Sequence, residues 1–354
     1  MPTRRAQQLG ILVCICAALL RSPAAFAAGE AAGDTAPPLD SFMVFGESVG
    51  SRASWPTSSA WGLEFRQTDA AHFAWSVAYL NDGHFPGHHR DGVSGEVWAP
   101  FTIDDLMTLS VGGGPFYYFD TEHADIPGGF ADVHGWALVL SADMRVALWS
   151  RLEQPGWFLD VRYDWSAPAR DIETHSIGLG IGYRMYSDFA SGTPTVGTVS
   201  GFARNEIVGY VGKTVVNSFS SQWSFAEAIE YRRELAAEVI RGSLAFVNEG
   251  NAQLVRRKGV LYEVWAEPSF WDGNASVGIG WGGYTAVDKS RPTTGRHVSY
   301  VVSATLSARL PNLLPIWQST TFGERTDVRV TWHRIVTDYD RDTDILLFGL
   351  GYRF

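Results

Sequence analysis

Side chains alternate along residues 346–354, and this pattern constrains the fold more than any other feature. Positions 346, 348, 350, 352 and 354 are large and apolar or aromatic, whereas the positions between them are mostly glycine or arginine. Alternation with a period of two predicts a β-strand with two different faces. We expect the apolar face to meet lipid and the small or charged face to line a lumen.

The end of the chain also carries a family resemblance. A chain that ends on Phe354 after alternating aromatic side chains resembles the C-terminal strand of bacterial outer-membrane β-barrel proteins. The resemblance implies the outer membrane of a Gram-negative bacterium, a porin-like or structural role, and contact with outer-membrane lipid and lipopolysaccharide. It also implies that the barrel assembly machinery reads the strand ending at Phe354.

The amino terminus is typical of a secretory signal peptide, predicted over residues 1–27. A basic start is followed by an apolar run over residues 9–20 and by the cleavage signal Ala25-Phe26-Ala27. The apolar run is too short to span a bilayer. Both cysteines, Cys14 and Cys16, lie in this segment, so we expect the mature chain to have neither disulfides nor thiol chemistry.

Net charge and hydropathy exclude other classes of protein. The formal net charge of -10 becomes -13 when the leader is removed, because the leader holds three arginines and no acid. An acidic chain argues against nucleic acid as a partner. After the leader, no apolar run is long enough for a transmembrane helix, so a membrane protein of this kind must be a closed barrel. A soluble β-sandwich is the alternative.

An internal repeat organises the chain. Residues 78–83 read Ala-Tyr-Leu-Asn-Asp-Gly, and residues 245–250 read Ala-Phe-Val-Asn-Glu-Gly. Further matches follow at the same offset of 167 residues, in 92–99 and 259–266. The mature chain therefore divides into a flexible periplasmic lead-in, a first eight-stranded repeat, a linker and a second eight-stranded repeat. Their predicted bounds are 28–41, 42–187, 188–205 and 206–354.

The predicted fold class is all-β, a transmembrane antiparallel β-barrel of about 16 strands arranged as two sets of eight. The strand lengths suit tilted membrane strands of about 9–11 residues. The single terminal assembly signal favours one sixteen-stranded barrel. The small residues and few charges on the predicted lumen faces favour the alternative, two tandem eight-stranded barrels that are filled by side chains.

Loop lengths predict which end of the barrel faces outward. In the first repeat the connections after the second and fourth strands are short, whereas 82–91 and 120–133 are longer. Short turns of such barrels lie on the periplasmic side and longer loops lie outside. An even number of strands then places both termini in the periplasm. The connection 311–326 departs from the pattern, because it is long and predicted to be periplasmic.

Charged residues fall on the predicted inward faces of both repeats. In a wide barrel they would form the wall of a selective pore. In a narrow barrel they would pair in a lumenal salt-bridge network, since charge away from water must be paired. The residues are Glu64, Arg66, Glu96, Arg162, Arg184, Glu263, Arg329 and Arg353.

Two clusters of possible metal ligands lie in predicted outer loops, and neither predicts a firm metal site. The first has ligand types for zinc, copper or nickel within eight residues, at no standard spacing. The second alternates like the start of a calcium loop but lacks the glycine and glutamate that complete one. Solvated polar loops explain both, and we predict no cofactor. The clusters are His84, His88, His89 and Asp91, and Asp338, Asp340 and Asp342.

One enzymatic interpretation rests on His333. The seventh and eighth strands of the second repeat resemble those of outer-membrane lipid A deacylases, whose His, Ser and acidic triad lies near the outer end of these strands. The serine of that family stands two residues after the histidine, where this chain has Ile335. Thr337 lies on the same face about 13 Å away. A hydrolase needs its nucleophile and base within hydrogen-bond reach, so His333 is an incomplete match.

The sequence therefore predicts an outer-membrane β-barrel protein, porin-like or structural and without catalytic activity. A lipid A-modifying hydrolase is one alternative. A surface ligand-binding or adhesion barrel is the other, acting through segments 82–91, 120–133 and 287–296. The three functions can be separated experimentally, because a pore conducts ions, a hydrolase releases fatty acid, and a binding barrel does neither.

Overall fold

The computed structural model describes most of the chain from residue 39 onward. The predicted signal peptide (1–27), the lead-in up to residue 38 and the predicted linker up to residue 204 lie outside the described residues. Residues 39–41, expected in the lead-in, already belong to the first strand. The described ranges are 39–51, 54–70, 73–85, 88–123, 130–168, 173–186, 205–216, 222–236, 239–252, 255–270, 273–290, 296–313, 320–337 and 341–354.

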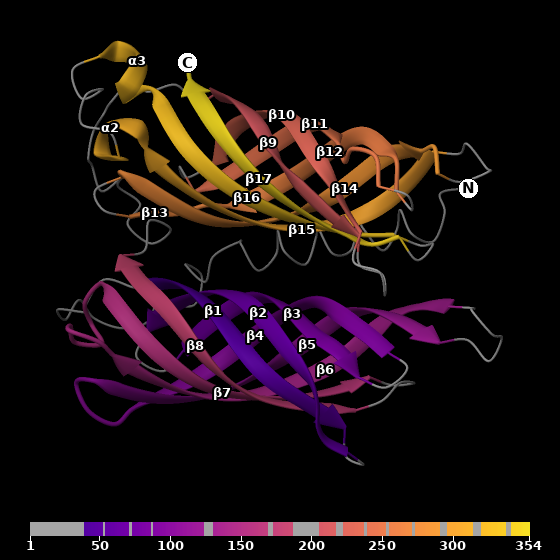
Figure 1. The fold of residues 1–354 in the computed structure, drawn as a ribbon. Helices are drawn as coiled ribbons and strands as arrows, with labels where there is room; N and C mark the ends of the chain where they lie inside the picture. Colours follow the sequence, from indigo (N-terminus) through magenta and orange to yellow (C-terminus); the bar gives the residue numbers. More distant parts are fainter. Residues whose placement is uncertain are drawn as a thin grey trace. The chain divides into compact units, whose positions relative to one another are not determined.

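The first repeat forms a closed antiparallel barrel of eight strands (Figure 1). Each strand pairs with the next along the chain, and β1 also pairs with β8 over its whole length, from Leu39 opposite Tyr186 to Ser51 opposite Thr174. The strands are β1 (Leu39–Ser51), β2 (Ser54–Ala70), β3 (Phe73–Phe85), β4 (His88–Thr102), β5 (Met107–His123), β6 (Phe130–Ala147), β7 (Gly156–Pro168) and β8 (Thr174–Tyr186).

The second repeat forms a second closed barrel of eight long strands plus the two-residue strand β13. It closes because β17 pairs with β9, from Thr343 opposite Val216 to Arg353 opposite Glu206, and because β12 pairs with β14. The strands are β9 (Asn205–Val216), β10 (Trp223–Ala236), β11 (Ile240–Asn248), β12 (Arg257–Ala266), β13 (Ser269–Phe270), β14 (Ala275–Asp288), β15 (Arg296–Arg309), β16 (Thr326–Val336) and β17 (Thr343–Arg353).

The structure corrects the preference for one sixteen-stranded barrel. In a single barrel, β8 would pair with β9 and β1 with β17. Instead β1 is bound by β2 and β8, and β9 is bound by β10 and β17. Since each strand has only two edges, these pairings use all the edges that a common barrel would need. The expected alternative, two eight-stranded barrels, is therefore confirmed.

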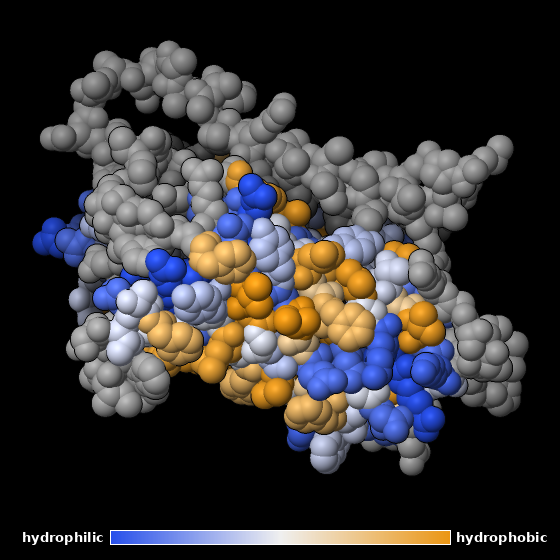
Figure 2. All heavy atoms as spheres, turned by 90° about the horizontal axis from the view of Figure 1, so that it is seen from above, coloured by the Kyte–Doolittle hydropathy of each residue, from blue (hydrophilic) through white to orange (hydrophobic). Residues whose placement is uncertain are grey.

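Alternating side chains explain why each sheet closes around a core. On β7, Val161 and Tyr163 are exposed while Asp160 and Arg162 are buried, as their alternation predicts. The outward face of β17 is likewise apolar, with Phe348 more than half exposed. On the face that Figure 2 shows, hydrophobic side chains form a band with hydrophilic ones on either side. Apolar residues on the outside and charged residues inside reverse the pattern of a water-soluble barrel.

Two expected outer loops are largely strand. The pairing of β3 with β4 continues to Phe85 opposite His88, and that of β5 with β6 continues to His123 opposite Phe130. The described parts of segments 82–91 and 120–133 therefore extend the hairpins, because their backbone groups keep pairing as strands.

The expected long connection between β15 and β16 holds two short helices, α2 (Leu310–Leu313) and α3 (Thr321–Glu324). Phe322 of α3 stacks on Tyr352 of β17, with ring centroids 5.9 Å apart. In the part of the chain that the structure describes, no helix combines the length and the apolar character needed to cross a bilayer.

Equivalent Asn-x-Gly backbone bends support the interpretation of the two halves as a repeat. Gly83, at an irregularity within β3, and Gly250, just after β11, both have positive φ, +72° and +82°. The backbone N–H of each donates to an asparagine two residues earlier, Asn81 at 2.9 Å and Asn248 at 3.2 Å. The shared Asn-x-Gly geometry explains why both halves of the sequence carry this motif.

Candidate functional site

The lumen of the first barrel holds a charge network around Glu64 on β2. This carboxylate is fully buried and accepts hydrogen bonds from Arg66 at 2.8 Å and from Arg145 at 2.6 Å, and it pairs with Arg162. Three arginines on three strands thus converge on one acid. Because each charge is paired, the network avoids the cost of isolated charge in a closed interior.

A second acid, Glu96 on β4, extends this network along the lumen. Arg162 donates to Glu96 at 3.1 Å and pairs with Asp164 at 2.6 Å. Ser141 and Ser94 donate to the two oxygens of Glu96 at 2.7 Å and 3.0 Å. Glu64, Arg66, Glu96 and Arg162 are all buried members of this network.

Both barrels contain the same tryptophan-centred layer. The indole N–H of Trp98 donates to Ser76 at 2.8 Å, and that of Trp265 donates to Ser243 at 2.9 Å. A guanidinium lies over each indole, that of Arg66 at 3.5 Å from the centroid of Trp98 and its counterpart Arg232 at 4.4 Å from that of Trp265. Such cation–π contacts hold the large rings across the lumen and fill it.

Arg329 on β16 organises the charge network of the second barrel. It donates to Glu267 at 2.9 Å and to Glu206 at 3.0 Å. Glu267 lies in the turn after β12 and also pairs with Arg232 and, at 3.7 Å, with Arg241. Burial alone would raise the pKa of the Glu267 carboxyl, but these three guanidiniums hold that pKa well below its usual range, so the group is ionised at neutral pH.

At the end of each barrel opposite the termini, a buried arginine is hydrogen-bonded to an acid and to a threonine. We call this arrangement a latch. In the first barrel Arg90 donates to Asp82 at 2.9 Å and to Thr174 at 2.8 Å. In the second barrel Arg257 donates to Glu249 at 2.7 Å and to Thr343 at 2.7 Å. Each latch ties a β-hairpin to the first residue of the closing strand.

His333 faces this closed interior and contacts Ser303 on the neighbouring strand. The Ser303 Oγ lies 2.7 Å from His333 Nδ1 and donates to Glu263, whose other oxygen is 3.5 Å from the same nitrogen. In a catalytic triad the histidine stands between serine and acid, using both of its nitrogens. Here both partners meet one nitrogen, and all three side chains are almost fully buried. The geometry does not favour a hydrolase acting on membrane lipid.

The remaining predicted charges lie at the end of each barrel where the termini are. Arg184 donates to the backbone carbonyl of Arg151 at 3.1 Å in the turn before β7. Arg353 pairs with Asp327, donating from Nε at 2.6 Å. Arg184 and Arg145 of the first network both lie over the ring of Phe158, with the guanidiniums 6.0 Å and 4.8 Å from its centroid.

Sequence reasoning missed several network members. Asp143 and Arg145 on β6 and Asp160 on β7 belong to the first network; Arg66 pairs with Asp143 at 2.6 Å. The alternation of side chains along β6 could have identified two of them. Asp143 and Arg145 are each two residues apart from the next inward position, in the series that begins at Ser141, whereas Met144 lies between them. Ser303 was missed because it precedes His333 by thirty residues and meets it only through strand pairing.

The candidate metal ligands do not gather in the residues that the structure describes. His88 pairs with Asp120 at 2.9 Å, and Asp342 accepts from the backbone N–H of Thr337 at 2.7 Å to shape its turn. Across the described ranges no three His, Cys, Asp or Glu side chains form a group that could hold a metal. Asp338, Asp340 and the side chain of His84 lie outside the described residues, whereas His89 and Asp91 are described.

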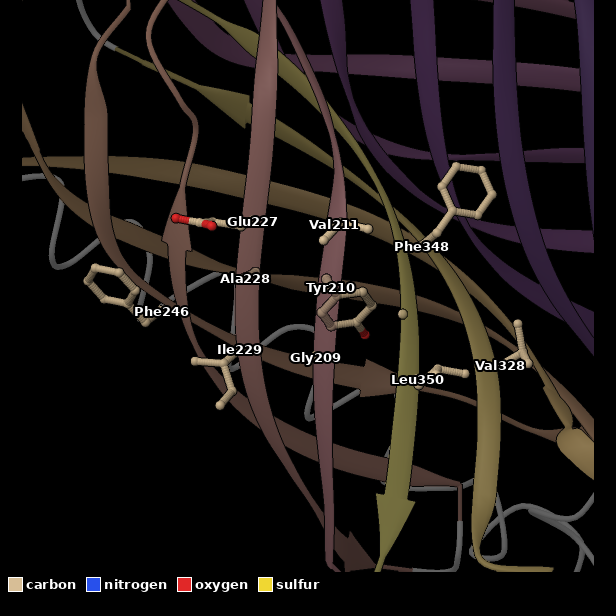
Figure 3. A pocket seen from close by; sticks show the side chains of 11 residues that line it. Gly209, Tyr210, Val211, Glu227, Ala228, Ile229, Phe246, Val328, Phe348 and Leu350 are labelled. Carbon is tan, nitrogen blue, oxygen red and sulfur yellow. The ribbon is translucent and has the colours of Figure 1, made fainter. Parts of the chain in front are cut away.

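A shallow apolar groove lies on the outer surface of the second barrel (Figure 3). Gly209 on β9 forms its floor, where a side chain would meet no atom within 4 Å. Ile229, Phe348 and Leu350 from neighbouring strands line it and are exposed. The groove is thus a gap in the outward apolar band and not an opening into the lumen.

No protein-family model and no curated protein matches this chain. Among solved structures, the N-terminal β-barrel domain of Pseudomonas aeruginosa OprF is 15% identical over 42% of this chain and 97% of its own, with a TM-score of 0.33. Ail of Yersinia pestis is 13% identical over 42% and 99%, with a TM-score of 0.32. Neisserial surface protein A is 9% identical over 41% and 96%, with a TM-score of 0.31. Identities and scores this low carry no argument about function.

Proposed function

We propose that this chain is an outer-membrane protein whose two barrels are structural and do not conduct. The observation that carries the proposal is the combination of filled, charge-paired lumens with apolar outward faces. Trp98, Phe45 and Phe116 are each at most 2% exposed inside the first barrel, as are Trp265 and Tyr284 inside the second. An eight-stranded barrel has an interior just wide enough to be filled by side chains.

The outward faces support membrane insertion. Leu179 on β8 is 70% exposed, and Val211 on β9 and Leu350 on β17 are more than half exposed. In water such a band would drive aggregation, whereas in a bilayer it meets the hydrocarbon. Of the two roles predicted from sequence, porin-like and structural, the filled lumens favour the structural one.

Single-channel recording of the refolded mature protein in a planar bilayer tests this proposal. Folding is first verified by a heat-dependent shift in gel mobility. We expect no stable conductance steps from folded protein, because paired charges and aromatic rings occupy both lumens. Reproducible steps of porin size would contradict the proposal, since they would require an open path that the network around Glu64 and Arg162 blocks.

A further inference from the structure

Three cations meet on the outward face of the second barrel, at the end opposite its termini. Arg256 and Lys258 flank the buried Arg257 at the start of β12, and Lys289 follows the end of β14; all three side chains are exposed. The Lys289 backbone N–H donates to the Arg256 carbonyl at 3.2 Å, so these two residues stand opposite each other. We call Arg256, Lys258 and Lys289 the cation patch.

The cation patch concentrates like charge without a described counter-ion. Residues two apart on a strand are separated by about 7 Å, and directly opposite residues by about 5 Å. Like charges at these distances destabilise a sheet. Within the described parts of the chain the three side chains enter no ion pair. The outward acid two strands away, Glu227, accepts instead from Asn248 at 2.8 Å.

The cation patch lies at the edge of the outward apolar band. Lys258 shares the outward face of β12 with Val260 and Tyr262, which are exposed and apolar, and it stands opposite Val287 on β14. The cations therefore lie where the apolar band ends. Basic residues immediately above a hydrocarbon-facing surface attract the phosphates of lipid head groups.

The first barrel shows that the fold does not require these cations. The equivalent hairpin places His89 opposite Thr121, as Arg256 stands opposite Lys289, and Asp91 opposite Phe119, as Lys258 stands opposite Val287. The corresponding positions thus carry histidine, threonine and aspartate. The cation patch is a property of the second barrel alone and is not needed for the hairpin to form.

We infer that the cation patch binds the phosphorylated head group of a lipid in the outer leaflet. This inference rests on the proposed membrane insertion, because only then does the apolar band set the patch at the level of the head groups. Two or more guanidinium and ammonium groups on one face can share a phosphate through charge-assisted hydrogen bonds. The acyl chains of the same lipid would lie along the exposed valines below.

Native mass spectrometry of the mature protein tests the inference, using micelles titrated with diphosphorylated lipid A. The variant Lys258→Gln/Lys289→Gln removes two exposed cations of the patch. The matched control, Lys213→Gln/Arg233→Gln, removes two other exposed cations on the outward faces of β9 and β10. We expect binding to weaken about tenfold to thirtyfold in the patch variant and less than about twofold in the control.

Two further probes identify what the patch recognises. Lipid A stripped of both phosphates should bind the wild-type protein about as weakly as diphosphorylated lipid A binds the patch variant. Inorganic phosphate at millimolar concentration should not displace the lipid. Equal binding by wild type and patch variant, equal binding of the dephosphorylated lipid, or displacement by free phosphate would each overturn the inference. Folding and absence of conductance are measured on the same samples, so failure of lipid binding is distinct from failure of the proposed function.

Discussion

At the scale of single residues, Arg162 links several carboxylates in the lumen of the first barrel. Arg162 contacts Glu64, Glu96 and Asp164, and its guanidinium also lies 4.8 Å from the ring centroid of Phe45. A single cation thus compensates carboxylates on three strands. Charges that are buried and compensated in this way contribute little net energy as a set, but removing one member leaves the others unpaired.

The substitution Arg162→Met should therefore destabilise the first barrel by about 3–5 kcal/mol. Chemical unfolding in micelles, followed by tryptophan fluorescence, measures the loss. Adding Glu96→Gln and Asp164→Asn to the same variant should restore part of it, because neutral side chains tolerate the missing cation. A loss below about 1 kcal/mol for the single variant would show that Arg162 does not compensate these acids.

At the scale of elements, the Asn-x-Gly bends bring glycine close to a neighbouring strand. A Cβ on Gly250 would lie 2.0 Å from the Phe225 carbonyl oxygen, in addition to the strain of a positive φ. Gly273, in the turn between β13 and β14, has a similar φ of +75° but no atom within 4 Å of such a Cβ. Substitutions at the two glycines therefore distinguish the effect of a steric clash from the effect of backbone strain.

We expect Gly250→Ala to cost more stability than Gly273→Ala. The second should cost about 1 kcal/mol, from the left-handed backbone alone, and the first should exceed it by several kcal/mol. Unfolding midpoints of the two variants under identical conditions give the comparison. Equal losses would mean that the close approach of Gly250 to Phe225 plays no part.

The local sequence pattern predicted which side chains face inward on a strand, but it did not predict which strands pair to close the barrel. The inward Arg162 and outward Tyr163 follow from alternation on one strand, which depends only on neighbouring residues. Barrel closure depends on which strand meets β1, and nothing local to Leu39 specifies Tyr186 as its partner. The Ser303 contact of His333 was missed for the same reason, since cross-strand partners are set by register.

At the scale of the whole molecule, two closed barrels differ from one wide barrel in solvent access to every lumenal charge. In the proposed function the same residues that would have lined a pore instead form compact cores. The two barrels also differ at equivalent positions, as the cation patch of the second barrel and the histidine and aspartate at the same positions of the first illustrate. The compact cores follow from the closure of each half upon itself.

Disulfide cross-linking tests this closure most directly, because both natural cysteines lie in the predicted leader and the remaining chain has none. The pair Val44→Cys/Ile181→Cys joins β1 to β8, and Ile207→Cys/Tyr352→Cys joins β9 to β17, at positions that stand opposite each other. Both pairs should form disulfides under mild oxidation, detected as loss of maleimide-reactive thiols. The mixed pairs Ile181→Cys/Ile207→Cys and Val44→Cys/Tyr352→Cys should not. Efficient cross-linking of the mixed pairs, with none in the first two, would contradict two separate barrels and support one barrel of sixteen strands.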